Sequence, residues 1–215
     1  MSAAAIEITG RDALLVVDVQ NDFVSGSMAI PGAEEVIEPI NASARAFEHV
    51  IVVTDWHPAG HVSFASAHPG AAHGDVVETP YGEQLVWADH CVQGTVGAEL
   101  APGLELTKAE LVFRKGYRLA VDSYGAFYEN DRETRTGLAD YLRGRGIERV
   151  FVAGLARYGC VLQTALGAAR DEFTVAMIDD GSAGRPDAES VAKSERLMSE
   201  AGIGWVRSAD FATAG

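Results

Sequence analysis

The amino-acid sequence predicts a three-layer α/β/α fold built on a six-stranded, mainly parallel sheet. Short apolar runs alternate along the chain with segments whose apolar residues recur at helical spacing. This alternation is typical of a parallel sheet that is covered by helices on both faces and connected by right-handed crossovers. Because 215 residues suffice for one well-cored domain, we expect a single domain over residues 1–215.

Six segments have the composition of strands. The first, second and fourth are continuous apolar runs, as expected of strands that are buried on both faces of a sheet. The other three complete the alternation with helices. In chain order, the predicted strands are residues 13–18, 50–54, 111–113, 150–153, 173–178 and 203–206.

Four helices are predicted between these strands from apolar residues at helical spacing. Gly146 ends the second helix, and Asp187 caps the fourth. Residues 19–23 are predicted as a loop, and a longer insertion at about 55–108 is rich in His, Gly and Pro. Loops of that length inside a compact domain are usually functional. The predicted helices are residues 33–49, residues 134–145, the segment that begins at Gly159, and residues 187–201.

Composition narrows the classes of function. A net charge of −14 argues against nucleic acid or an anionic membrane as partner, because both require basic patches. No apolar run is long enough to span a bilayer and no secretory signal is visible, so we expect a cytoplasmic protein. In a reducing compartment, Cys91 and Cys160 are expected as free thiols. The sequence leaves open whether the chain forms a homo-oligomer.

Four reactive side chains lie at or just beyond the carboxyl ends of predicted strands, namely Asp18, Asp55, Lys115 and Cys160. In open α/β sheets the ligand binds along this edge, where the strand order reverses. Taken singly, a cysteine is more often a small buried hydrophobe, and a lysine is more often a surface residue. Their coincidence at one edge is the main argument for an active site.

Asp18, Lys115 and Cys160 make chemical sense as one unit. Cys160 is expected in the first turn of a helix, where free N–H groups and the macrodipole lower the pKa of a thiol. A carboxylate beside it can remove the thiol proton and later protonate a leaving amine. The positive charge of Lys115 stabilises the thiolate and restrains the proton affinity of Asp18. The free N–H groups can also hold an oxyanion.

Five of the six histidines lie close together in the long insertion, at His57, His61, His68, His73 and His90. Asp55-x-His57 at a strand end, with a third ligand from a distant loop, suits Zn²⁺, Fe²⁺ or Mn²⁺. The alternative is a polar loop whose histidines are solvated. Spacing alone leaves open whether His61 is a fourth ligand or a neighbour of the ligands.

Five sets of residues, in this order, carry a resemblance to a known family. They are residues 15–23 (LVVDVQNDF), 55–65 (DWHPAGHVSFA), 87–95 (WADHCVQGT), Lys115-Gly116 with 122–124 (DSY), and 154–156 (GLA) with Cys160-Val161. Over nearly its whole length the chain resembles nicotinamidases (pyrazinamidases) of the isochorismatase-like cysteine hydrolase superfamily. The resemblance implies a Rossmann-like fold. It also implies hydrolysis of nicotinamide, or a close heteroaromatic amide such as pyrazinamide, to the acid and ammonia through a cysteine thioester.

The same resemblance implies roles for individual residues. Cys160 would be the nucleophile, Asp18 the general base and Lys115 its charge partner. One divalent ion per chain, Zn²⁺ in first place with Fe²⁺ or Mn²⁺ as alternatives, would anchor the ring nitrogen directly or through water. The expected metal ligands are Asp55, His57 and His90, and the expected pocket walls are Phe23, Trp87 and Tyr124. A cis Leu155–Ala156 peptide would aim the Ala156 and Cys160 N–H groups at the oxyanion.

The chain departs from the family pattern before the nucleophile. Family members usually read Ala-Thr-Asp-(Tyr/His)-Cys, whereas residues 156–160 read Ala-Arg-Tyr-Gly-Cys. Gly159 removes an aromatic side chain, so the pocket is expected to accept a bulkier ring substituent, with Arg157 or Tyr158 contacting it. Two alternatives therefore stay open at this point. One is a related amidohydrolase for another small carboxamide or ureido substrate, and the other is a catalytically silent metal-binding homologue.

Overall fold

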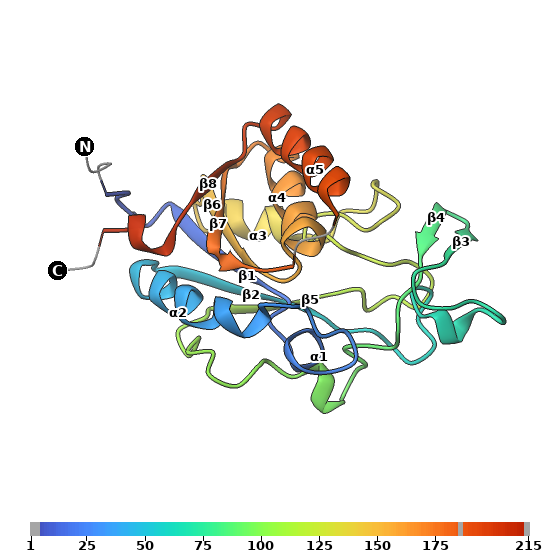
Figure 1. Ribbon diagram of the computed structural model, residues 1–215. Helices are drawn as coiled ribbons and strands as arrows, with labels where there is room; N and C mark the ends of the chain where they lie inside the picture. Colours follow the sequence, from blue (N-terminus) through green and yellow to red (C-terminus); the bar gives the residue numbers. More distant parts are fainter. Residues whose placement is uncertain (1–4, 185–186, 213–215) are drawn as a thin grey trace.

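The structure is a computed structural model that describes residues 5–184 and 187–212. Its centre is a six-stranded sheet in the order β5-β2-β1-β6-β7-β8, in which every neighbouring pair is parallel (Figure 1). The predicted fold class is confirmed. The strands are β1 (Asp12–Val17), β2 (His49–Asp55), β5 (Leu111–Lys115), β6 (Arg149–Gly154), β7 (Thr174–Ser182) and β8 (Gly204–Val206).

Helices cover both faces of this sheet. On one face lie α3 (Leu138–Gly144), α4 (Leu162–Arg170) and α5 (Ala188–Glu200), whereas α2 (Ile37–Ala46) lies on the other (Figure 1). All six residues of β1 are buried because the strand contacts both layers. Its alternate residues Leu14 and Val16 pack with α2, whereas Leu15 and Val17 pack with the helices of the opposite face.

The strand order places a switch point beside β1. The chain passes from β1 outward through β2 to β5, and then returns to β6 on the other side of β1 before continuing to β7 and β8. The connections that follow β1 and β6 therefore run to opposite faces of the sheet, to α2 and α4, which creates the crevice in which ligands bind in open α/β sheets. No helix in the described residues is long and apolar enough to cross a membrane.

The structure corrects several predicted boundaries. Residues 19–23, predicted as a loop, overlap the helical turn α1 (Asn21–Val24). The helix predicted over 33–49 begins with a 3₁₀ turn and ends at Ala46. The helix predicted over 134–145 begins only at Leu138, because Gly137 has a φ of +94°. The insertion that was predicted as irregular contains the hairpin β3 (Val76–Thr79) and β4 (Gly82–Leu85).

Asp187 caps α5 as predicted, because its side chain accepts the backbone N–H groups of Glu189 and Ser190. The hairpin of β3 and β4 forms an arm that projects from the body of the molecule (Figure 1). It faces the crevice at the carboxyl edge of the sheet, so the insertion contributes to the surroundings of the candidate site.

Candidate active site

The ends of β1 and β6 are shaped by unusual backbone conformations. Asp18 has a φ of +53°, so the chain leaves the sheet directly after Val17. Gly154 ends β6 with a φ of +123°, and a Cβ atom there would lie 1.9 Å from the carbonyl oxygen of Val17. Only glycine allows this approach. The next peptide, Leu155–Ala156, is cis as predicted.

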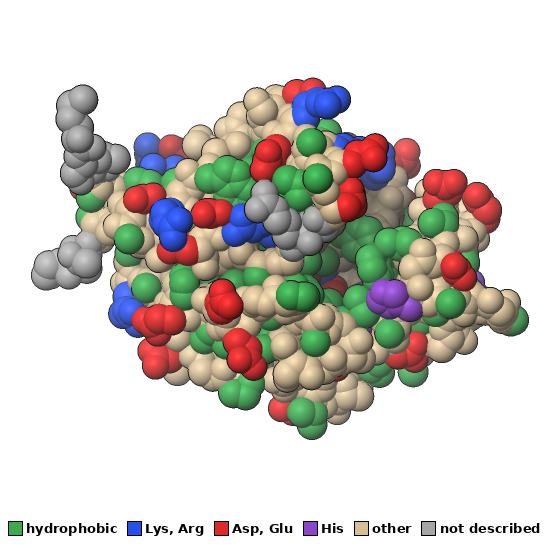
Figure 2. Space-filling model, in the orientation of Figure 1, with side chains coloured by type: hydrophobic (Ala, Val, Ile, Leu, Met, Phe, Trp, Pro, Cys, Tyr) green, Lys and Arg blue, Asp and Glu red, His purple; other side chains and the backbone are tan. Residues whose placement is uncertain are grey.

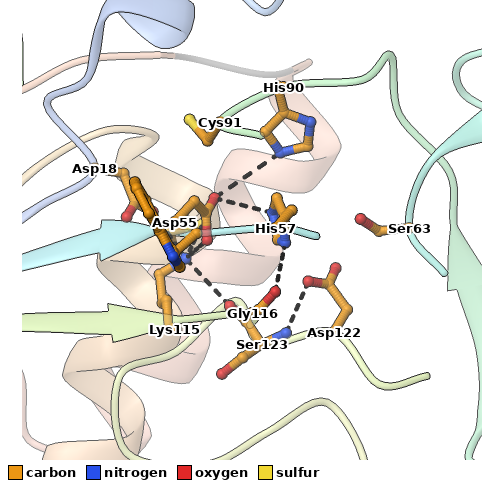
Figure 3. Close-up of polar contacts among 12 residues, drawn as sticks. Asp18, Asp55, His57, Ser63, His90, Cys91, Lys115, Gly116, Asp122 and Ser123 are labelled. Carbon is orange, nitrogen blue, oxygen red and sulfur yellow. Dashed lines mark hydrogen bonds and ion pairs between the residues drawn. The ribbon is translucent and has the colours of Figure 1, made fainter. Parts of the chain in front are cut away.

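Of the four reactive residues at the carboxyl edge, the other three lie close to the ammonium group of Lys115. Its Nζ lies 2.9 Å from Asp18 Oδ2 and 2.5 Å from Asp55 Oδ1. The same nitrogen is 3.5 Å from Cys160 Sγ and donates to the carbonyl oxygen of Ser123 at 3.1 Å. The Lys115 and Asp18 side chains are completely buried, and Figure 3 shows both carboxylates directed toward the ammonium group. Residues far apart in the sequence thus form one compact charged cluster.

The two carboxylates of this cluster differ in proton affinity. Burial and the charge of Asp55 raise the pKa of Asp18 to about 7, although Lys115 opposes this shift. Burial also acts to raise the pKa of Asp55, but the charges of Lys115 and His57 hold it below its usual range. Burial lowers the pKa of Lys115, yet the two carboxylates keep it well above its usual value. Lys115 therefore stays charged while Asp18 is poised to exchange a proton near neutral pH.

Cys160 does not have the predicted depressed pKa. It is partly buried in a single π-helical turn (Arg157–Val161), and α4 begins only at Leu162. Burial raises the pKa of the thiol well above its usual value, and Lys115 offsets this only in part because Asp18 adds a negative charge. The thiol therefore carries its proton at rest and needs a base.

Asp18 places a buried carboxylate beside this thiol. Neither of its carboxylate oxygens accepts a well-formed hydrogen bond from the described residues, although Lys115 Nζ is close to one of them. The ligand atoms of Asp18, Asp55 and Cys160 all lie within 4.8 Å of one another. Within the described part of the chain, the Ala156 N–H also has no backbone acceptor. The cluster thus holds a thiol, a buried carboxylate and an ammonium group together.

A second group of ligand atoms adjoins the first through Asp55. Its Oδ2 lies 3.6 Å from His57 Nε2 and 3.9 Å from His90 Nε2 (Figure 3). The Nδ1 atoms of the two rings lie 2.8 Å and 2.7 Å from the carbonyl oxygens of Gly116 and Ala88. A carbonyl can only accept, so each Nδ1 carries the proton and each Nε2 presents a lone pair. Asp55, His57 and His90 therefore fit a divalent metal ion.

The potential ligand atoms of His61 group with those of His57 and Asp122, and not with those of Asp55 and His90. Its ring stacks on His57 with centroids 4.2 Å apart. Its Nδ1 lies 2.7 Å from Ser63 Oγ, and its Nε2 lies 3.3 Å from the carbonyl oxygen of Val121. Because both nitrogens already have partners in the protein, His61 is better suited to holding the His57 ring in place than to ligating an ion.

The remaining histidines of the insertion lie outside this group. His68 bonds to the carbonyl oxygen of Val62, and His73 accepts from the Ala88 N–H and packs against Trp87. Of the five histidines in the insertion, His57 and His90 face Asp55, and His61 packs against His57. His68 and His73 bond to other residues of the insertion.

The three expected wall residues are Phe23, Trp87 and Tyr124. Phe23 contacts a proposed metal ligand, and Trp87 and Tyr124 contact each other. Phe23 packs edge-on against His90, with ring centroids 5.3 Å apart. Trp87 Nε1 donates to the Tyr124 hydroxyl at 3.1 Å, and Gln84 Nε2 donates to the same oxygen at 3.2 Å. Gln84, which sequence reasoning missed, thereby ties the arm to the pocket wall. Its position in a short polar hairpin gave no signal of this role.

A groove of about 780 Å³ lies outside Trp87 and Tyr124, and Gly159 lines it from the other side. Figure 2 shows the surface hollowed between the body of the molecule and the arm. A Cβ atom on Gly159 would meet only Ala156 Cβ, at an ordinary 3.6 Å, so this position has room for a side chain. Tyr158 also lines the groove, whereas Arg157 is held away by an ion pair with Asp179.

Fold and site together define a class of protein, in which a parallel α/β sheet holds a cysteine, a lysine and a carboxylate in contact at its carboxyl edge. The chain belongs to the isochorismatase family, whose domain matches residues 12–210. It is 48% identical to a nicotinamidase of Acinetobacter baylyi over 74% of each chain.

Solved structures show the same relationship. A nicotinamidase/pyrazinamidase of Acinetobacter baumanii superimposes with a TM-score of 0.91 at 41% identity, over 94% of this chain and 98% of the other. A pyrazinamidase of Pyrococcus horikoshii in complex with zinc has a TM-score of 0.74 at 31% identity, over 92% of this chain and 99% of the other. The fold and the family resemblance seen in the sequence are both confirmed.

Proposed function

We propose that this protein is an amidohydrolase that converts nicotinamide, or a close heteroaromatic amide such as pyrazinamide, to the carboxylic acid and ammonia. The observation that carries the proposal is the contact of Lys115 Nζ with Asp18, Asp55 and Cys160, directly beside His57. The similarity to nicotinamidases supports this substrate class over another small carboxamide or a ureido compound. The complete set of reactive side chains argues against a catalytically silent homologue.

The first half of the reaction forms a thioester. Asp18 takes the proton of the Cys160 thiol as sulfur attacks the carbonyl carbon and the carbonyl electron pair moves to oxygen. The N–H groups of Ala156 and Cys160 donate to this oxyanion. Lys115 stabilises the negative charge that passes between sulfur and carboxylate. The C–N bond then breaks, and the proton held by Asp18 moves to the leaving nitrogen, which departs as ammonia.

The second half regenerates the thiol. Water replaces ammonia beside Asp18, which removes a water proton as the oxygen attacks the thioester carbon. The same N–H groups hold the second oxyanion, the C–S bond breaks, and Asp18 returns the proton to Cys160. The raised pKa of Asp18 suits this role, because one group must accept and release a proton in each half.

Asp55, His57 and His90 would hold one divalent metal ion. When bound, the ion supplies a coordination point for the ring nitrogen of the substrate, directly or through water. Zn²⁺ is the first choice because it takes nitrogen and oxygen ligands and because the pyrazinamidase neighbour was solved with zinc. Fe²⁺ and Mn²⁺ suit the same ligands. Phe23 and Trp87 would then hold the two faces of the ring.

An ammonia-release assay over a small panel of amides tests this proposal. Nicotinamide and pyrazinamide should be hydrolysed, and benzamide should react much more slowly because it lacks the ring nitrogen that the metal site would anchor. Allantoate provides a ureido control and should not react. Turnover confined to the ureido compound, or absent from the whole panel with the metal-loaded protein, would contradict the proposal.

A further inference from the structure

Gln20 is completely buried at the carboxyl edge of the sheet, and its side-chain amide bonds to two separate segments. Its Oε1 accepts the Asp55 N–H at 2.8 Å, and its Nε2 donates to the Asp55 carbonyl oxygen at 2.8 Å. The second amide hydrogen goes to the carbonyl oxygen of Ala98 at 2.9 Å. Both polar groups of the Asp55 backbone are therefore held by one side chain.

The path of β1 explains why this side chain is needed. Asp18 still donates its N–H to Val53 of β2, but its positive φ then turns the chain away from the sheet. Asp55, at the end of β2, pairs with Lys115 of β5 on one side and has no backbone partner from β1 on the other. The amide of Gln20 occupies that missing place and continues the pairing beyond the end of β1.

The position of Asp55 matters to both groups of the candidate site. Its Oδ1 contacts Lys115 Nζ, while its Oδ2 faces the Nε2 atoms of His57 and His90. A small rotation of the Asp55 backbone would move both oxygens at once. Groups that orient a metal-binding residue commonly change metal affinity or activity by 10- to 100-fold when they are removed.

We propose that Gln20 is a positioning residue that couples the Lys115 cluster to the metal ligands by holding the backbone of Asp55. The expected effect of Gln20 on catalysis rests on the proposed function. Its effect on metal binding depends on Asp55, His57 and His90 alone and can be measured without any substrate.

Gln20→Met tests the proposal, because methionine has a similar length and leaves the Asp55 N–H and carbonyl without partners. We expect the affinity for Zn²⁺, measured by competition with a chromogenic chelator, to fall about 10- to 100-fold. KM for nicotinamide should rise with it. The matched control is Asn41→Leu, since Asn41 is also a buried side-chain amide but holds the Gly103 carbonyl and the Glu105 N–H instead of Asp55. This control should bind Zn²⁺ within about twofold of the wild type.

A purely structural role would give a different result. Gln20→Met would then lower the urea midpoint while the folded protein kept the wild-type Zn²⁺ affinity, and that outcome would overturn the proposal. If Gln20→Met fails to fold, Gln20→Asn decides, because asparagine keeps a neutral amide but is too short to bond both Asp55 backbone groups. It should also weaken Zn²⁺ binding, and wild-type Zn²⁺ affinity in this variant would overturn the proposal. A wild type inactive on nicotinamide, combined with weakened Zn²⁺ binding in the variant, would refute the proposed function but not this inference.

Discussion

Replacing Lys115 with methionine would remove the positive charge from a buried cluster and keep the length of the side chain. Asp18 and Asp55 would remain, with carboxylate oxygens within 4.8 Å of each other. Their side chains are 0% and 4% exposed, so solvent screens them little. Breaking a buried ion pair by removing one partner destabilises a protein by about 3–5 kcal/mol. We expect a loss of this size for the metal-free protein at pH 8.

The loss should depend on pH in a defined direction. In the wild type, Asp18 has a pKa raised from 3.8 to about 7, and Asp55 has one held below its usual range by Lys115. Asp55 therefore stays ionised from pH 4 to pH 8, whereas Asp18 loses its proton near pH 7. Because the folded pKa of Asp18 is raised, its ionisation costs stability as pH rises, and the charge of Lys115 reduces that cost. The difference in unfolding free energy between variant and wild type should accordingly grow as pH rises from about 4 to about 8.

Urea unfolding at pH 5 and pH 8, followed by circular dichroism in the presence of a chelator, measures this difference. Lys108→Met is the matched control, since the Lys108 ammonium donates to the backbone carbonyl of Phe47 and faces no carboxylate of the cluster. We expect the control to lose about 1 kcal/mol at both values of pH. A loss below about 1 kcal/mol for Lys115→Met, or an equal loss at both values, would refute the electrostatic reasoning.

Three further predictions concern the proposed chemistry. Cys160→Ala should abolish ammonia release with an unchanged unfolding midpoint, whereas Cys91→Ala should keep substantial activity; equal losses would mean that the nucleophile is wrongly assigned. Alanine at any one of the three proposed metal ligands should reduce the ion content from one per chain in elemental analysis, and unchanged content in all three variants would contradict the metal site. Gly159→Tyr should lower kcat/KM for a ring-substituted nicotinamide relative to nicotinamide, because the new side chain would fill part of the groove that Gly159 lines. A ratio equal to that of the wild type would show that this turn does not shape the pocket.

The sequence could predict which residues meet at the site because the parallel sheet brings the ends of its strands together. Asp18, Asp55 and Lys115 each end a strand or follow one, and parallel strands bring their carboxyl ends to one edge. The contact of Lys115 with Cys160 follows from the same rule once the strand order reverses beside β1. The apolar strand patterns and the residues that follow them were enough to infer these contacts.

Properties that depend on distant packing could not be inferred in the same way. The thiol of Cys160 was expected to have a lowered pKa from its place near a helix, but burial by other segments raises it. The amide of Gln20 acts on Asp55, which lies 35 residues further along the chain, so its role depends on the exact backbone path after β1. The hairpin of β3 and β4 was missed because its strands are only four residues long, only one of their residues is buried, and few are apolar.

The central claim is that Cys160 attacks the carbonyl carbon of a ring that the site holds in place. Pyridine-3-carbaldehyde tests it directly, because a thiol adds to its carbonyl and leaves the thiol hydrogen on oxygen as a stable thiohemiacetal. With the aldehyde carbon labelled with ¹³C, NMR of the metal-loaded wild type and of Cys91→Ala should show the thiohemiacetal signal. The signal should be missing from Cys160→Ala, and its persistence in that variant would contradict the assignment of Cys160 as the nucleophile.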